Sequence, residues 1–205
     1  MNANDKKKVL EMYGRLSVEV KERNPDLDWN LDRFDVPFEE LRNSKMSPVD
    51  AWIYATFFIK PNVDYTEDSR GGSWTIVNSV RKTHEIKKGI CNDRAVAILG
   101  LIDPKYKPQL VYVSGEFPGH SMTVYQEEGK FGSLSASVMD KTGRRDPNYN
   151  SLVGMLKTYP WSRFGIVDWK SKFPDFMDRD REMYFEFKSD FYVNRENLPI
   201  SAVQF

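Results

Sequence analysis

Two side chains in this 205-residue sequence have the types needed for nucleophilic chemistry, a cysteine and a histidine. Cys91 is the only cysteine, and it stands directly before an apolar run in the stretch GICNDRAVAILGL. A thiol attacks a carbonyl carbon as the thiolate, so it needs surroundings that favour the thiolate and a base that takes its proton. His120 follows further along the chain and is the candidate base.

A second interpretation of these residues is structural. Free cysteine is among the most buried residue types, so Cys91 could be inert packing in front of an apolar helix. The other histidine, His84, lies in the lysine-rich segment RKTHEIKK, where we expect a solvated side chain without a functional role. The order and the surroundings of Cys91 and His120 therefore have to decide between chemistry and packing.

The element that would position Cys91 is a helix. Residues 95–102 are apolar on nearly every side, which is typical of a helix enclosed by other structure. If this helix begins at Asn92 or Asp93, Cys91 lies at its positive end, where unpaired N–H groups favour a thiolate and can hold an oxyanion. The charge of Asp93 acts against the thiolate, and the charge of Arg94 offsets part of that effect.

The element that would position His120 is the second of three predicted strands. Their ranges are 109–114, 120–126 and 130–138, and the turn Glu-Glu-Gly joins the last two. This order predicts an antiparallel meander directly after the cysteine's helix. His120 follows the turn Glu-Phe-Pro-Gly, so its ring is expected near an edge of the sheet.

The rest of the chain predicts further helices, a loop and a late strand. In a helix over residues 5–23, apolar side chains at helical spacing should face the core: Val9, Tyr13, Leu16 and Val20. A buried helix follows the sequence SPVD, in which a serine can cap the helix and a proline suits its first turn. Other predictions are a loop over 62–74, helices over 75–87 and 148–158, and a strand over 183–193.

Composition and charge limit the classes of function. An apolar content of 40% in 205 residues suffices for one domain spanning residues 1–205. Thirty basic and thirty acidic side chains cancel, so no net charge favours nucleic acid or an anionic membrane as a partner. One cysteine and two histidines are too few soft ligands for a typical zinc site, and we expect neither a metal nor a cofactor.

The N-terminal sequence MNANDKKKVLEMYGRL lacks the apolar segment and the cleavage site of a signal peptide. No apolar run in the sequence is long enough to cross a bilayer. Since the single cysteine cannot form an internal disulfide, these features predict a cytoplasmic protein with a free thiol.

The residues around Cys91 resemble the core of the transglutaminase-like superfamily, a group of papain-like cysteine enzymes. Gly89, Cys91, Asp93 and Ala95 match its G-x-C-x-D-x-A pattern at the start of the nucleophile's helix. His120 matches the family's histidine, and the run GKFGSLS resembles the following strand, commonly G-K-W-x-x-L-D. The resemblance implies a peptide or protein substrate and a Cys-His-Asp triad.

This resemblance covers about residues 47–138 and implies an α+β fold, in which the cysteine's helix packs on an antiparallel sheet. Residues 139–205 are then a C-terminal elaboration. The segment from a buried helix through Val63-Asp64-Tyr65 to Trp74 is also similar to what often precedes the family's cysteine.

One position departs from the family's pattern. The family's aspartate is expected 15 residues after the histidine, where this sequence has Ser135 between Ser133 and Ser137. A serine hydroxyl can orient the imidazole of His120 but brings no charge to stabilise the imidazolium. Asp140 or a carboxylate from another segment could complete the triad instead, and the three serines could simply form a small-residue strand.

An oxyanion needs two donors. The backbone N–H of Cys91 is the first, and a side chain from the preceding segment is the second. Trp74 and Asn78 are the candidates, although a core anchor and a surface amide are the structural alternatives for them.

The leading hypothesis is a cysteine hydrolase, either a peptidase or an amidase, or an acyltransferase. Cys91 attacks a peptide or protein amide, His120 moves the proton, Ser135 orients His120, and an acyl-thioester passes to water or to an amine. The second hypothesis is an inactive transglutaminase-like module that binds a peptide or partner protein, which Ser135 favours. An arylamine-type acetyltransferase is a third option, but no coenzyme A pocket can be located in the sequence.

Overall fold

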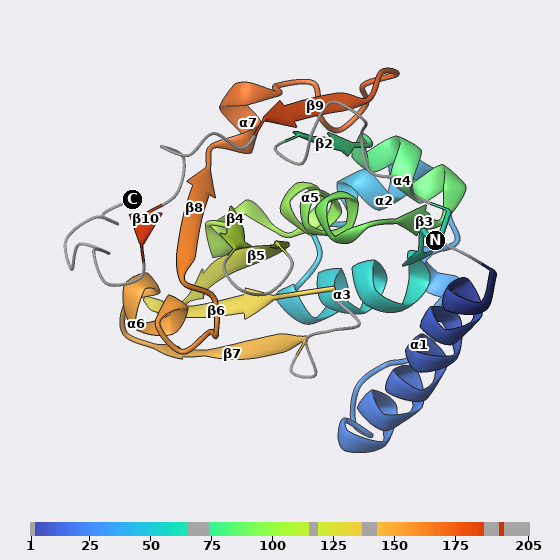
Figure 1. Ribbon diagram of the computed structural model, residues 1–205, viewed down its shortest axis with the longest axis horizontal. Coiled ribbons are helices and arrows are strands. Elements are labelled where there is room, and N and C mark those ends of the chain that lie inside the picture. Colours follow the sequence, from blue (N-terminus) through green and yellow to red (C-terminus); the bar gives the residue numbers. More distant parts are fainter. Residues whose placement is uncertain (1–2, 65–73, 115–118, 137–142, 187–192, 195–205) are drawn as a thin grey trace.

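The structure is a computed structural model that describes residues 3–64, 74–114, 119–136, 143–186 and 193–194. It is an α+β fold, as predicted, built on one six-stranded antiparallel sheet (Figure 1). The described helices are α1 (Ala3–Arg23), α2 (Phe38–Asn43), α3 (Pro48–Ile53), α4 (Val80–Ile86), α5 (Cys91–Leu101), α6 (Leu152–Leu156) and α7 (Trp169–Lys172). Shorter helical turns occupy Asp32–Phe34, Tyr54–Phe58 and Pro104–Tyr106.

The main sheet has the strand order β10-β8-β4-β5-β6-β7. Its strands are β4 (Gln109–Ser114), β5 (His120–Glu127), β6 (Lys130–Leu134), β7 (Arg144–Tyr149), β8 (Arg163–Val167) and β10 (Val193–Asn194). Strands β4, β5 and β6 form the predicted antiparallel meander, which is confirmed with His120 opposite Val113 and Thr123 opposite Leu134. His120, the first residue of β5, therefore lies where this strand of the sheet begins.

Helix α5 packs on one face of this sheet, and α6 packs on the other. The first face contributes Leu110, Tyr112, Tyr125 and Leu134 to a core shared with α5 and the helices α2 and α3. The second face contributes Val111, Val113, Met122 and Val124 to a smaller core with α6. Side chains alternate between the faces along each strand, as the two-residue period of a strand requires.

Helix α3 begins as the sequence predicts. The Ser47 hydroxyl accepts a hydrogen bond from the Asp50 N–H at 3.1 Å, and Pro48 occupies the first turn. The buried helix predicted after the sequence SPVD is also confirmed, and it continues beyond α3 as a π-helical turn over Tyr54–Phe58.

Two small sheets flank α5. The antiparallel pair of β2 (Trp74–Val77) and β9 (Met183–Glu186) joins the middle of the chain to its C-terminal part. The parallel pair of β1 (Lys60–Pro61) and β3 (Lys88–Gly89) lies directly before Cys91. The predicted helix over 75–87 is therefore wrong for residues 75–77, which form β2, and right for α4.

Other predictions need correction. Residues 148–149 belong to β7, so the predicted helix over 148–158 shortens to α6. The predicted strand over 183–193 divides between two sheets, because β9 pairs with β2 and Val193 of β10 pairs with β8. Of the predicted loop over 62–74, residues 65–73 lie outside the described part of the chain, and Trp74 begins a strand.

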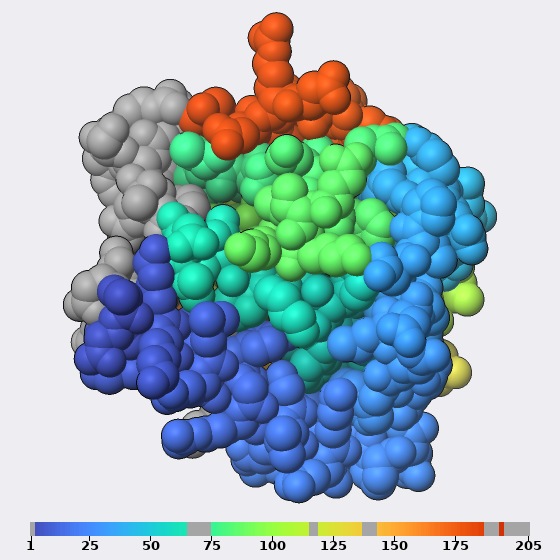
Figure 2. All heavy atoms as spheres, turned by 90° about the vertical axis from the view of Figure 1, so that its right-hand side faces the viewer, coloured from blue at the N-terminus to red at the C-terminus, as the bar shows by residue number. Residues whose placement is uncertain are grey.

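Helix α1 lies on the surface of the molecule, beside the segment that follows α3 (Figure 2). The predicted inner face is confirmed in direction, since Tyr13 is buried and Val9, Leu16 and Val20 are half-buried. The Tyr13 hydroxyl donates a hydrogen bond to the Thr56 carbonyl, and Lys6 pairs with Asp64.

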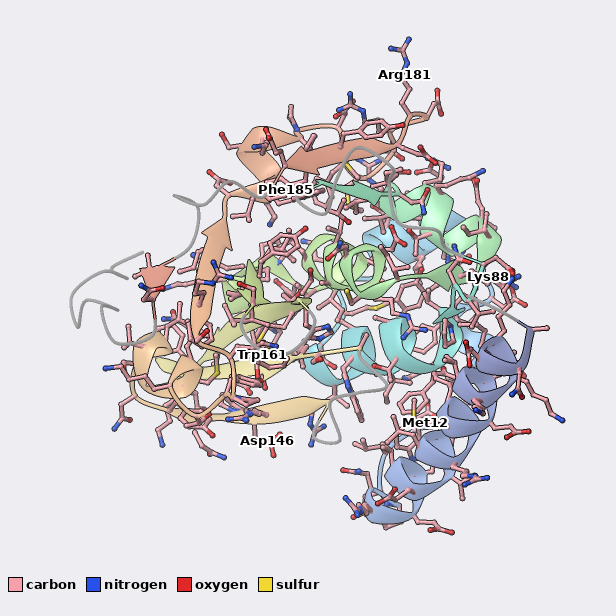
Figure 3. All side chains as sticks on the ribbon, in the orientation of Figure 1. Met12, Lys88, Asp146, Trp161, Arg181 and Phe185 are labelled. Carbon is pink, nitrogen blue, oxygen red and sulfur yellow. The ribbon has the colours of Figure 1, made fainter. Side chains whose placement is uncertain are left out.

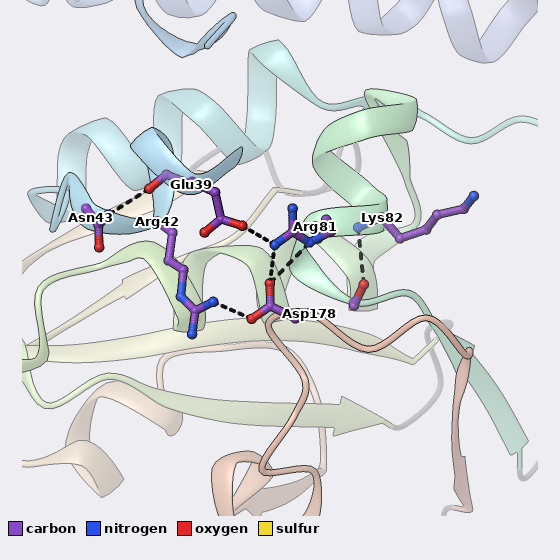
Figure 4. Close-up of polar contacts among 7 residues, drawn as sticks. Glu39, Arg42, Asn43, Arg81, Lys82 and Asp178 are labelled. Atoms are coloured by element: carbon purple, nitrogen blue, oxygen red, sulfur yellow. Dashed lines mark hydrogen bonds and ion pairs between the residues drawn. The ribbon is translucent and has the colours of Figure 1, made fainter. Parts of the chain in front are cut away.

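An ion-pair network holds the C-terminal segment on the helices (Figure 4). The Arg81 guanidinium of α4 lies 2.7 Å from an Asp178 carboxylate oxygen and also pairs with Glu39 of α2. Arg42 completes the network by pairing with the same aspartate. By contrast, Arg181 extends from the turn before β9 into solvent (Figure 3).

Candidate active site

Cys91 is the first residue of α5, one residue earlier than the sequence predicts. The Asp93 carboxylate fixes this helix start, because its Oδ2 accepts from the Ile90 N–H and its Oδ1 from the Asn78 N–H, each at 2.8 Å. Gly89 leaves room for Asp93, since a Cβ at Gly89 would lie 2.9 Å from the Asp93 Cβ. The glycine and the aspartate of the matched pattern thus position the cysteine at the helix N-terminus.

The thiol of Cys91 lies against the start of β5. The backbone N–H of Ser121 interacts with the sulfur, and the Asn92 amide oxygen lies 3.7 Å from it. Burial is the largest influence on the thiol and raises the pKa of Cys91 above its usual value. The Asp93 charge raises this pKa further, while the Ser121 N–H and the Arg94 charge act to lower it, as the sequence predicts for the two charges.

Ser135 lies next to His120, 15 residues away along the chain. The His120 Nε2 and the Ser135 Oγ are 2.6 Å apart, which is the distance of a short hydrogen bond. Both residues are buried, with exposed fractions of 7% and 2%. The indole of Trp161, from the segment between α6 and β8, stacks on the imidazole at 19° with ring centroids 5.9 Å apart. The ring of His120 is therefore held on one side by a hydroxyl and on one face by an aromatic plane.

Cys91 and His120 both lie at the N-terminal end of β5, the cysteine against Ser121 and the histidine one residue earlier in the strand. The residue after His120, Ser121, holds the sulfur through its N–H, and its hydroxyl donates to the Asn92 amide oxygen. Ser121 points to α5, whereas His120 leaves the strand on the face of Met122, at the first position of β5. The Cα atoms of His120 and Ser121 are consecutive in the strand and about 3.8 Å apart.

Asn92 is a site residue that the sequence analysis missed. Its Nδ2 donates to the Thr75 hydroxyl of β2 at 2.5 Å, while its Oδ1 accepts from Ser121 of β5. The buried amide therefore joins two sheets to the N-terminus of α5. A polar residue at the start of an otherwise apolar helix was the available signal, but its partner Thr75 lay in a segment predicted to be helical.

Neither candidate for the second oxyanion donor is seen to point at the sulfur of Cys91. The Asn78 side-chain amide lies 3.4 Å from the Asp93 carboxylate, so it supports the helix start instead of pointing at the sulfur. The backbone of Trp74 in β2 pairs with Glu186 in β9, and the side chain of Trp74 lies outside the described part of the structure. Asp140 and Ser137 are also outside the described residues. The Ser133 hydroxyl contacts the Tyr159 hydroxyl at 2.6 Å.

The expectation of a solvated His84 is wrong. This side chain is buried, with its Nε2 2.8 Å from the Val36 carbonyl and its Nδ1 3.1 Å from the Tyr54 hydroxyl. Its ring stacks with Tyr54 and Phe58. Because the carbonyl can only accept, Nε2 donates to it. His84 is thus a buried core residue, which the lysines around it in the sequence did not indicate.

No group of His, Cys, Asp and Glu that could hold a metal ion occurs among the described residues. Within the same residues no helix combines the length and the apolar character needed to cross a membrane. In comparisons with known proteins, no family model and no curated protein matches the chain.

Proposed function

We propose that this protein is a cysteine-dependent enzyme with a transglutaminase-like core, acting on a peptide or protein amide through an acyl-thioester. The observation that carries the proposal is the arrangement at the start of β5. There His120 is hydrogen-bonded to Ser135 at 2.6 Å, and the next backbone N–H holds the sulfur of Cys91. Inert packing of Cys91 requires no oriented histidine one residue before the N–H that contacts the sulfur.

The order of elements also supports the proposal. A nucleophile at the N-terminus of α5, a histidine at the start of β5 and an orienting residue after β6 follow the order that the resemblance implies. The packing of α5 on an antiparallel meander is the matching architecture. A free thiol used as nucleophile suits a reducing compartment, so a cytoplasmic location is part of the proposal.

The proposed reaction begins from a neutral pair, because burial keeps the thiol of Cys91 protonated. His120 takes the thiol proton as the sulfur attacks the amide carbon, so a carbon–sulfur bond forms and the carbonyl electron pair moves to oxygen. The Cys91 N–H at the helix N-terminus stabilises this oxyanion. Collapse of the intermediate breaks the carbon–nitrogen bond, and the imidazolium protonates the leaving amine.

Hydrolysis completes the cycle. Water, deprotonated by His120, attacks the thioester, the acid leaves and the Cys91 sulfur regains its proton. An amine in place of water gives acyl transfer by the same steps. We favour hydrolysis, since no described element forms a dedicated site for an acceptor amine beside Cys91.

In this scheme Ser135 is a positioning residue. When the Nε2–H of His120 donates to the Ser135 hydroxyl, Nδ1 is the nitrogen that accepts the proton from sulfur. The hydroxyl holds the ring but adds no negative charge, so the imidazolium is less stabilised than beside a carboxylate.

The second candidate function is a catalytically inactive module that binds a peptide or partner protein at the same site. The raised pKa of Cys91 and the serine at the third position of the triad favour it. The two candidates differ in whether sulfur forms a covalent acyl intermediate.

The test uses p-nitrophenyl acetate as a generic acyl donor and intact-protein mass spectrometry as the readout. An acetyl group on Cys91 that forms faster in the wild type than in His120→Ala supports the enzyme, and Cys91→Ser is the control for other sites. Acetylation at equal rates in the wild type and His120→Ala would support the binding module.

A further inference from the structure

Arg94 is a buried cation that the proposed reaction does not yet use. It lies three residues after Cys91 on α5 and is only 3% exposed. Its Nη1 donates to the Ala136 carbonyl at 2.6 Å and its Nη2 to the Ile59 carbonyl at 2.8 Å. Among the described residues no carboxylate lies within ion-pair distance of this guanidinium. Burying a charge beside neutral carbonyls lowers the stability of the fold, so packing alone does not account for Arg94.

The Ala136 carbonyl connects Arg94 to the histidine. Ala136 directly follows Ser135, whose N–H donates to the Gly143 carbonyl at 2.6 Å and whose hydroxyl bonds to His120. The end of β6 is therefore fixed by the backbone of Gly143 and by the guanidinium from α5. Through this path the helix that carries Cys91 determines where the partner of His120 lies.

The charge of Arg94 also acts on the thiol. It lowers the pKa of Cys91, in opposition to burial and to the Asp93 charge, which raise that pKa. The Tyr13 ring of α1 lies 5.9 Å from the guanidinium carbon and helps to keep water away from it. Since charges interact more strongly where water is excluded, the effect on a developing thiolate is larger than at the surface.

We propose that Arg94 is a positioning residue of the reaction, which ties the Ser135 end of β6 to the cysteine's helix and places a fixed positive charge beside the thiolate. The inference rests on the proposed function. In a triad without a carboxylate, the imidazolium gains no charge partner from Ser135. Arg94 compensates at the opposite end of the pair, because it stabilises the negative charge that forms on sulfur.

The test compares Arg94→Gln, which removes the charge, with Arg94→Lys, which keeps it but can reach fewer carbonyls. Iodoacetamide labels the only cysteine, so its rate against pH reports the thiolate directly. Among the described residues, the charges that act on the thiol are those of Asp93 and Arg94 of α5, and the titratable side chain of His120 lies at the start of β5. Rates are compared above pH 7.5, well above the pKa of about 6 that Asp93 has in the wild type.

We expect Arg94→Gln to lower the alkylation rate at a given pH by about two- to fivefold, because the thiol loses a positive charge that lowers its pKa. Arg94→Lys should stay within about twofold of the wild type in alkylation, yet lose several-fold in acetylation by p-nitrophenyl acetate, because the Ser135 end is no longer fixed. Arg81→Gln removes a guanidinium of the distant network and is the matched control.

A folded Arg94→Gln variant with the wild-type alkylation profile would overturn the inference. If that variant does not fold, Arg94→Lys decides: wild-type rates of both alkylation and acetylation contradict the positioning role, and loss of acetylation alone supports it. Failure of the proposed function looks different, because His120→Ala would then acetylate as fast as the wild type.

Discussion

Replacing Ser135 by aspartate tests how the missing charge limits the histidine. The side chain at this position is 2% exposed, and its oxygen lies 2.6 Å from the His120 Nε2. A carboxylate placed there accepts a charge-assisted hydrogen bond, worth about 1.5–3 kcal/mol against about 0.5–1.5 kcal/mol for a neutral one. The difference of about 1–1.5 kcal/mol corresponds to a rise of about one unit in the pKa of His120 in Ser135→Asp.

The assay is a proton NMR titration of the imidazole ring resonances. The sequence has only two histidines, and His84 lies in a separate aromatic cluster, so its ring resonances should be the same in every Ser135 variant and serve as an internal reference. Ser135→Ala is the matched variant without any acceptor. We expect the pKa of His120 to increase from Ser135→Ala through the wild type to Ser135→Asp, with faster alkylation of Cys91 at pH 7 in the last. Equal titrations of His120 in all three proteins would refute the reasoning that the hydroxyl contacts and orients this ring in solution.

Three further predictions concern the surroundings of the site. Burial raises the pKa of Asp93 from 3.8 to about 6, so the folded state holds its proton more tightly than the unfolded state. The free energy of unfolding should therefore fall by about 2 kcal/mol as the pH rises from 4 to 7, and urea titrations of Asp93→Asn should show a smaller decrease. Trp161→Ala removes the ring stacked on His120, which should destabilise the fold by about 1–3 kcal/mol and reduce the alkylation rate of Cys91; unchanged alkylation would contradict a role in holding the imidazole. His84→Leu leaves the Val36 carbonyl and the Tyr54 hydroxyl without their partner. This should lower the free energy of unfolding by about 2–4 kcal/mol but leave the alkylation profile of Cys91 unchanged.

The sequence predicted best where one local pattern determines the structure. The apolar run after Cys91 favours a buried helix, and the strands on either side of the Glu-Glu-Gly turn alternate clearly, so α5 and the β4–β6 meander were predicted. The strand predicted over 130–138 ends already at Leu134 in β6. The helix start was one residue off, because it depends on the Asp93 carboxylate accepting an N–H from Asn78, a contact made across 15 residues.

The failures have a common physical cause, which is pairing between distant segments. Residues 74–77 form a strand because β9 offers its edge more than a hundred residues later, and nothing local in the sequence reveals that partner. His84 is buried for a similar reason, since its acceptor Val36 and its neighbour Tyr54 come from earlier segments. The role of Arg94 was visible only as a charge, because its carbonyl partners Ile59 and Ala136 carry no signal in their side chains.

The central claim is that His120 acts on the thiol of Cys91, and alkylation by iodoacetamide between pH 5 and 9 tests it most directly. With one cysteine in the chain, the rate in the wild type and in His120→Ala refers to the same sulfur. If His120 takes the thiol proton, the wild type should react about tenfold faster than His120→Ala near pH 7, and the difference should shrink as the pH rises toward 9. Identical profiles in the two proteins, both rising only near or above the reference thiol pKa of about 8.5, would contradict the account.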